Sequence, residues 1–386
     1  MIASSKDKLL FTPGPLTTSH LVKQAMLHDA GSWHFEFNQV VQTLRDQLLG
    51  VAGAAPGEEY ETVLLQGSGT YGIESVLGSA IPAEGKLLVL SNGAYGERMA
   101  RIAGVLKIDH RVLRCGEAEA PSPDELDAAL ASDRDISHVA LVHCETTTGI
   151  LNPLDAIGRI VARHKRVFIV DAMSSFGGIP IGLREASIDF LVSSANKCLE
   201  GVPGFCFVIA RKERLLECAG RARSLSLNLL DQWQGFEKNG QFRFTPPTHA
   251  LLALAQALPE LEAEGGVPAR GARYAANHRA LLDGMKSLGF APFLRPDLQS
   301  FIITAFGYPN TPAFRFPDFY RRLSDCGMII YPGKLTRQDT FRIGTIGRLF
   351  PEDIVALVHV IQATLSAMGC ALPVTQAYAS ALSDPA

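Results

Sequence analysis

Short apolar runs alternate with helical patterns from about residue 35 to residue 220, and this alternation constrains the fold more than any other feature. Five runs have the length and near-continuous apolarity of strands buried on both faces. They cover residues 62–66, 86–91, 138–143, 167–171 and 188–194. Helical patterns or helix starts occur at residues 37–50, Ser122–Pro123 and Asn152–Pro153. The sequence therefore predicts an α/β domain whose mostly parallel sheet carries helices on both faces.

The pattern changes near residue 262. Residues 211–260 are less regular, and the remainder predicts a smaller α+β domain. Its expected helices and strands cover residues 272–288, 300–306, 316–327, 328–333 and 351–369. We therefore divide the chain into an N-terminal segment (1–20), a large domain (21–262), a small C-terminal domain (263–370) and a tail (371–386). The tail is rich in alanine and serine, which predicts disorder.

Composition narrows the class of protein. Hydrophobic residues make up 47% and charged residues 19%, and the net charge is −3, so we expect neither a nucleic-acid nor a membrane partner. The seven cysteines are odd in number and none forms a CxxC pair, which argues against a disulfide framework and against a zinc or other metal site. No apolar run has the length of a signal-peptide core or a membrane span, so we expect a cytoplasmic protein.

The most distinctive polar residues follow the predicted strands. They are Gln66-Gly67-Ser68-Gly69-Thr70, Asn92-Gly93-Ala94-Tyr95, Glu145-Thr146-Thr147-Thr148-Gly149, Asp171 and Asn196-Lys197. Ligands of parallel α/β sheets bind beyond the carboxyl ends of the strands. We therefore expect these residues to line one rim of the sheet and to form the ligand site.

The stretch "GSGTYG" at residues 67–72 has two functional interpretations. It matches the GxGxxG pattern of dinucleotide-binding proteins, but the next predicted strand ends in Ser91-Asn92, without the acid that would hold a ribose. The alternative is a phosphate-binding turn at a helix N-terminus. An isolated GxGxxG is most often a plain glycine turn. Its place beside the other strand ends favours the phosphate-binding turn.

Asp171 and Lys197 follow two predicted strands that a single crossover separates. Alone, Asp171 would be read as a helix cap or an ordinary ion pair, but its place in one pocket with a lysine changes that interpretation. Pyridoxal 5′-phosphate (PLP) needs both groups: a lysine forms a Schiff base with its aldehyde, and an aspartate keeps its ring nitrogen protonated. A partly desolvated lysine amine loses its proton readily and can then move protons. The small residues around Lys197 leave room for such a ring.

Seven stretches then carry a family resemblance. They are "FTPGPLTTS", "LLQGSGTYG", "LSNGAYGERM", "HCETTTGILNPLD", "VDAMSSFGGIPI", "SSANKCLEGVPGF" and "FRIGTIG". With these motifs in order over about residues 9–369, the sequence resembles the class V aminotransferases of PLP fold type I. The resemblance implies a PLP-binding large domain, with residues 1–20 over the active site, and a homodimer with shared active sites.

The resemblance also implies roles for single residues. Lys197 and Asp171 would be catalytic. Thr245 would reach the cofactor phosphate from the partner subunit, and Tyr95, a tryptophan in many relatives, would stack on the ring. The remaining cofactor contacts would come from Ser68, Gly69, Thr70, Thr146 and Asn196.

Substrate contacts are expected from Arg342, whose guanidinium could fork onto a carboxylate or phosphonate, and from Thr17 and Thr18. Arg243 and Lys334 could supply further positive charge for a dianion. Residues 31–38 are expected at the pocket edge without an assigned role.

The reaction that the resemblance implies moves the amino group of 2-aminoethylphosphonate to pyruvate, giving phosphonoacetaldehyde and L-alanine in phosphonate degradation. Alternatives on the same fold are an alanine– or serine–glyoxylate aminotransferase and a lyase or desulfurase. From another class, the glycine turn leaves a nicotinamide-dependent oxidoreductase.

Overall fold

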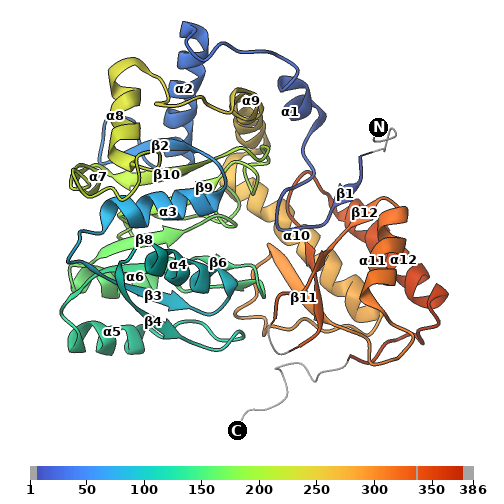
Figure 1. The fold of residues 1–386 in the computed structure, drawn as a ribbon. Coiled ribbons are helices and arrows are strands. Elements are labelled where there is room, and N and C mark those ends of the chain that lie inside the picture. Colours follow the sequence, from blue (N-terminus) through green and yellow to red (C-terminus); the bar gives the residue numbers. More distant parts are fainter. Residues whose placement is uncertain (1–6, 336–337, 377–386) are drawn as a thin grey trace.

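The computed structural model describes residues 7–335 and 338–376. The larger part of the fold is built around a seven-stranded sheet (Figure 1). The strand order is β2-β10-β9-β8-β5-β3-β4, and β10 alone is antiparallel to its neighbours. The strands are β2 (Tyr60–Gln66), β3 (Lys86–Ser91), β4 (Asp109–Arg114), β5 (Ile136–Val142), β8 (Val167–Asp171), β9 (Phe190–Ser194) and β10 (Phe205–Arg211). This arrangement confirms the predicted α/β class with a mostly parallel sheet.

Helices cover this sheet, so its inner strands are buried on both faces. All five residues of β9 are buried, for example, as the continuous apolarity of its sequence requires. α3 contacts β9 and β10, α4 contacts β3 to β5, and α6 contacts β8. The helices of this part are α1 (His20–Ala25), α2 (Phe35–Val51), α3 (Gly69–Ala80), α4 (Ala94–Val105), α5 (Pro123–Ser132), α6 (Leu154–Arg163), α7 (Lys212–Leu216), α8 (Leu229–Asn239) and α9 (Thr248–Glu264).

Local sequence signals explain some helix starts but not all of them. The Ser122 hydroxyl accepts a hydrogen bond from the Glu125 N–H and caps α5, as its sequence predicts. Asn152 does not cap α6. Its amide instead donates to the Val142 main-chain oxygen at 2.7 Å, and it is joined to Asn92, so it ties the ends of β3 and β5 together.

Three regions differ from the sequence prediction. β4 was not predicted because it is an edge strand whose exposed and half-buried residues, "DHRVLR", include three charged side chains. β10 was also not predicted as a strand. Residues 211–260, expected to be irregular, contain α7, α8 and most of α9, because the apolar positions of these helices pack on the large core.

The C-terminal part contains a three-stranded antiparallel sheet of order β11-β14-β13. The long helix α10 contacts both α9 and α12 and so connects the two parts (Figure 1). β1 pairs with β12, which attaches the N-terminal segment to this part. These elements are α10 (Gly266–Ser287), β11 (Ile303–Gly307), α11 (Phe316–Asp325), β12 (Met328–Ile329), β13 (Tyr331–Pro332), β14 (Thr340–Gly344), α12 (Pro351–Ala367) and β1 (Leu9–Leu10). A short ribbon, β6 (Cys144–Glu145) and β7 (Ile150–Leu151), follows β5.

The hydrophobic core has two main clusters. The larger is formed by the strands of the seven-stranded sheet and the helices that pack on them, and the other joins Phe11 to apolar residues between Leu281 and Val374. The expected disorder does not begin at residue 371, because the Val374 N–H donates to the Leu288 oxygen and Gln376 bonds both main-chain groups of Ala291. The rest of the predicted tail, residues 377–386, lies outside the described residues.

Among the residues that the structure describes, no helix has both the length and the apolarity needed to cross a membrane.

Candidate active site

One cavity at the carboxyl ends of β2, β3, β5, β8 and β9 collects most of the predicted site residues. Gly14 of the N-terminal segment also lines it. The predicted residues in its lining are Ser68, Gly69, Thr70, Tyr95, Thr146, Asp171, Asn196 and Lys197. The polar residues that follow the strands therefore line one cavity in the folded chain, as the sequence predicts.

The turn between β2 and α3 has the features of a phosphate site. Ser68 is the N-cap of α3, yet its hydroxyl makes no capping hydrogen bond within the chain. The main-chain N–H groups of the first helical turn lack partners inside the helix, and the helix dipole favours an anion there. A Cβ at Gly69 would meet the sulfur of Met173, so a larger residue would displace that flexible side chain from the turn. The turn thus leaves a space that an anion can fill.

Asp171 ends β8 with its carboxylate buried in the cavity wall. Burial raises the pKa of this carboxyl from 3.8 to about 6, against the effect of the Met173 N–H, which donates to Oδ1 at 3.0 Å. A buried carboxylate in this position is costly unless a cationic group faces it. The protonated ring nitrogen of PLP is such a group.

Lys197 follows β9 and projects into the same cavity. Its Nζ donates a hydrogen bond to the Pro13 main-chain oxygen at 2.6 Å, and burial lowers the pKa of the amine. The lowered pKa increases the fraction of neutral amine, which is the form that attacks an aldehyde. The N-terminal loop is in close contact with the lysine, since a Cβ at Gly14 would lie 2.5 Å from Lys197 Cδ.

Tyr95, in the first turn of α4, lies between two cations. The Arg98 guanidinium carbon and the Lys334 Nζ each lie 4.8 Å from the centroid of its ring, and Lys334 Nζ is 3.3 Å from its hydroxyl. Burial alone would raise the pKa of Tyr95, but the positive charge of Lys197, a hydrogen bond with Thr146 and the charge of Lys334 together lower it. The cations around the phenol therefore outweigh the effect of its burial on its pKa.

Arg342 lies on β14 next to this cavity and is only 1% exposed. Its Nε donates to the Pro332 main-chain oxygen at 2.9 Å and its Nη1 to the Thr146 main-chain oxygen at 2.5 Å. Among the described residues it forms no ion pair with a carboxylate. Burial lowers the pKa of the guanidinium. A buried cation held only by carbonyl groups is prepared to receive an anion.

Besides Arg342 and Lys334, which contact cavity-wall residues without lining the cavity, four predicted contacts lie outside it. The Thr17 hydroxyl accepts the Leu10 N–H at 2.8 Å and stabilises the N-terminal loop, and Thr18 is buried beside it. Thr245 is exposed in the 241–247 loop, where its main-chain oxygen accepts a hydrogen bond from Gln66. Arg243 is paired with Asp231 at 3.5 Å instead of facing the cavity.

Three cavity-wall or supporting residues were given no individual role from the sequence. Arg98 lines the cavity and donates to the Thr70 hydroxyl at 3.2 Å, and Met173 lies against the phosphate turn. The buried Glu145 accepts hydrogen bonds from the Tyr95 and Gly96 N–H groups and so caps α4. Of these three residues, only Glu145 could be located from the sequence, because it follows a predicted strand.

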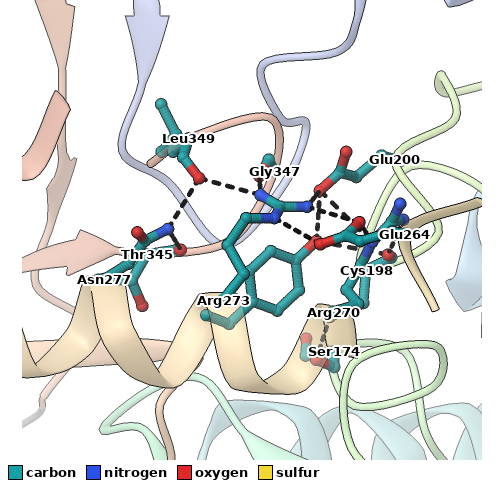
Figure 2. Close-up of polar contacts among 11 residues, drawn as sticks. Ser174, Cys198, Glu200, Glu264, Arg270, Arg273, Asn277, Thr345, Gly347 and Leu349 are labelled. Atoms are coloured by element: carbon teal, nitrogen blue, oxygen red, sulfur yellow. Dashed lines mark hydrogen bonds and ion pairs between the residues drawn. The ribbon is translucent and has the colours of Figure 1, made fainter. Parts of the chain in front are cut away.

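A buried polar network contacts the loop that follows Lys197, at Cys198 and Glu200 (Figure 2). Arg273 of α10 donates to Glu200 at 2.7 Å and to the main-chain oxygens of Gly347 and Leu349. Arg270 donates to the Cys198 main-chain oxygen at 3.0 Å. Because Gly347 follows β14, the network connects the loop that carries the lysine to the strand that carries Arg342.

The fold and this site define a class of enzyme. Residues 20–311 match the family model of the class V aminotransferases. The chain belongs to the class V aminotransferases, and it is a PLP-dependent aminotransferase. This membership sets aside the nicotinamide interpretation of residues 67–72.

Particular relatives are closely similar. The 2-aminoethylphosphonate–pyruvate transaminase of Salmonella schwarzengrund (strain CVM19633) is 53% identical over 364 residues, which cover 94% of this chain and 99% of the relative. Among solved structures, the pyridoxamine–pyruvate aminotransferase of Mesorhizobium loti has a TM-score of 0.86 at 23% identity, covering 96% of this chain and 95% of that one. The alanine–glyoxylate aminotransferase of Nostoc sp. has a TM-score of 0.85 at 25% identity, covering 95% and 97%.

The cavity residues fit PLP. Lys197 would hold the aldehyde carbon, Asp171 the ring nitrogen, and the Ser68–Thr70 turn the phosphate. When bound, PLP supplies an aldehyde that exchanges amino groups and a ring that withdraws electrons from the carbon bearing the substrate's amino group.

Proposed function

We propose that this protein transfers the amino group of 2-aminoethylphosphonate to pyruvate, giving phosphonoacetaldehyde and L-alanine in the degradation of phosphonates. The 53% identity to a relative named for this activity, over almost the full length of both chains, supports the choice of substrates. Ping-pong kinetics are expected, because the amino group is held by the enzyme between donor and acceptor.

Arg342 is the observation that carries the proposal. Its buried guanidinium lies next to the cavity that holds Lys197, and among the described residues only main-chain carbonyl oxygens accept its hydrogen bonds. A phosphonate of the donor or the carboxylate of pyruvate could accept two parallel hydrogen bonds from it. The same arginine would then orient both substrates in turn.

The chain's own groups have distinct tasks in this reaction. The Lys197 amine, freed when substrate binds, takes the proton from the carbon that bears the donor's amino group. Asp171 stabilises positive charge at the far side of the cavity. The apolar and aromatic wall, with Tyr95 and Met173, excludes water from the reacting carbon.

A donor panel tests the proposal. The holoenzyme is mixed with 2-aminoethylphosphonate, L-serine or L-alanine, with pyruvate or glyoxylate as acceptor, and the absorbance of bound cofactor is followed. We expect the phosphonate and pyruvate to give a kcat/KM at least 100-fold above that of serine with glyoxylate. Rapid turnover of serine without turnover of the phosphonate would show that the enzyme is a serine–glyoxylate aminotransferase instead.

We also propose a homodimer in which each active site takes Thr245 from the partner subunit. Thr245 is exposed and lies outside its own chain's cavity, and large apolar side chains are exposed in the same loop, in α3 and at the start of α2. They include Trp33 (81% exposed), Phe35 (64%), Tyr71 (53%) and Phe244 (44%). Such exposed apolar groups are typical of an interaction surface.

Mixing inactive variants tests this sharing. A hybrid of a Lys197→Ala chain and a Thr245→Asp chain would contain one intact site if Thr245 acts across the interface, so activity should return on mixing. The control pairs Lys197→Ala with Asp171→Asn, which belong to the same chain's cavity and should not complement. If the first pair stays inactive while forming dimers, Thr245 does not act in the partner's site.

We place the protein in the cytoplasm, because all seven cysteines are free thiols and several are buried near the site. Fractionation of cells that express the protein tests this assignment.

A further inference from the structure

Lys334 approaches the active site from the same hairpin as Arg342. It follows β13, which pairs with β14, and Tyr331 of β13 is the register partner of Arg342. The Lys334 ammonium reaches the hydroxyl of Tyr95 at 3.3 Å. From this one hairpin, Lys334 reaches the first turn of α4 and Arg342 reaches Thr146.

The two cations converge on one small region. Arg342 donates to the main-chain oxygen of Thr146, and Thr146 is also hydrogen-bonded to Tyr95, whose hydroxyl contacts Lys334. Arg98, the other cation beside Tyr95, is instead bonded to Thr70 in the phosphate turn. Tyr95 thus contacts one cation that is bonded to the phosphate turn, Arg98, and another from the hairpin of Arg342, Lys334.

Lys334 has no acidic partner of its own among the described residues. Its side-chain contacts there are the hydroxyl and the ring of Tyr95. Glu145, a buried acid that contacts the Tyr95 main chain, already accepts hydrogen bonds from α4 and from Thr147. The hairpin therefore places the buried Arg342 and the exposed Lys334 against two residues of the cavity wall, Thr146 and Tyr95, and among the described residues neither cation is paired with a carboxylate.

Two cations match a phosphonate better than a carboxylate. A carboxylate has two oxygens and one negative charge, which a single guanidinium fork satisfies. A phosphonate has three oxygens and, like a phosphate monoester, carries close to two negative charges near neutral pH. Lysine is a compact point charge that can contact an oxygen that the arginine fork leaves free.

We propose that Lys334 is a specificity-determining residue that binds the third oxygen and second charge of the donor's phosphonate. This inference rests on the proposed function and deepens it. Arg342 is the anion contact for both substrates, and Lys334 distinguishes the dianionic donor from carboxylate amines such as L-alanine.

Half-reactions of one enzyme provide the test, because L-alanine and 2-aminoethylphosphonate both convert the bound cofactor to its amino form. The absorbance of the bound cofactor is followed after mixing wild-type or Lys334→Met holoenzyme with each donor separately. We expect Lys334→Met to raise the concentration of 2-aminoethylphosphonate that gives half the maximal rate by about tenfold, and that of L-alanine by less than twofold. Lys334→Arg should recover most of the lost affinity. Lys286→Met, an exposed lysine at the end of α10, is the matched control.

Equal losses for both donors would overturn the proposal, because Lys334 would then act on Tyr95 or the cofactor and not on the phosphonate. No loss for either donor would also overturn it. A wild-type enzyme that reacts with L-alanine but not with 2-aminoethylphosphonate would refute the proposed function itself, a result that the wild-type arm shows before any variant is compared.

Discussion

The Nζ of Lys197 donates a hydrogen bond to the main-chain oxygen of Pro13 across 2.6 Å, although 184 residues separate the two in the sequence. The loop that contains Pro13 is itself fixed by the Thr17 hydroxyl, which accepts the Leu10 N–H, and by the pairing of β1 with β12. The N-terminal segment is therefore a structural wall of the site. Its position depends on the C-terminal part of the chain.

Gly14 tests the importance of this wall. Its φ is +121°, which a residue with a Cβ rarely adopts, and a Cβ there would lie 2.5 Å from Lys197 Cδ. We expect Gly14→Ala to lower kcat/KM at least tenfold, because the loop must move away from the lysine. The control is Gly31→Ala, where the nearest atom to an added Cβ is 3.8 Å away. Activity close to wild type in Gly14→Ala would show that the loop can move without consequence.

Asp171 gives a pH-dependent prediction for the apoenzyme. Burial raises its pKa from 3.8 to about 6, so the folded protein holds this proton more tightly than the unfolded chain. Its contribution to stability is complete below the unfolded value of 3.8 and is lost as the pH rises through about 6. Asparagine does not ionise, so Asp171→Asn avoids this loss. The free energy of unfolding of the variant minus that of the wild type should therefore be about 1 kcal/mol larger at pH 7.5 than at pH 5.

Urea unfolding of both apoenzymes at the two pH values measures this difference. Asp283→Asn, at an exposed position of α10, serves as the control and should show no such change. Asp171→Asn should also lower kcat/KM by a factor of about 100 or more, because the neutral amide cannot stabilise a cationic ring nitrogen. A stability difference that shrinks as the pH rises would contradict the assignment.

The ion network in Figure 2 predicts a large stability effect away from the cavity. Arg273→Met leaves the buried Glu200 carboxylate without its 2.7 Å partner, and it removes one hydrogen bond each from the main-chain oxygens of Gly347 and Leu349. We expect the free energy of unfolding to fall by about 3 kcal/mol. Arg279→Met, an exposed arginine on the same helix, should change it by less than about 0.5 kcal/mol. Equal effects in the two variants would show that the network does not stabilise the fold.

The sequence predicts the cavity-wall residues that lie at the end of a strand or directly after it. Asp171, Lys197 and the Ser68–Thr70 turn were located because parallel strands place their carboxyl ends at one edge of a sheet. Arg98 gave no comparable signal, since a charged residue inside a helix is most often solvent-exposed. Arg342 was assigned only through the family resemblance, because a lone arginine in a strand has no local mark of burial.

The fold shows the same limits. β4 was missed because an edge strand does not need continuous apolarity, and the direction of β10 depends on its neighbours in space. Thr17 was expected to contact substrate from its place in a hydroxyl-rich loop. Its hydroxyl is used instead for the Leu10 hydrogen bond, a partner that the sequence pattern could not identify.

The central claim is that the Lys197 amine forms the covalent link to PLP. Reduction of the holoenzyme with borohydride, followed by proteolysis and mass spectrometry, measures it most directly. We predict a pyridoxyl group on the peptide that contains Lys197, and its absence from an otherwise folded Lys197→Ala protein. A pyridoxyl group on another lysine, or none on Lys197, would contradict the account.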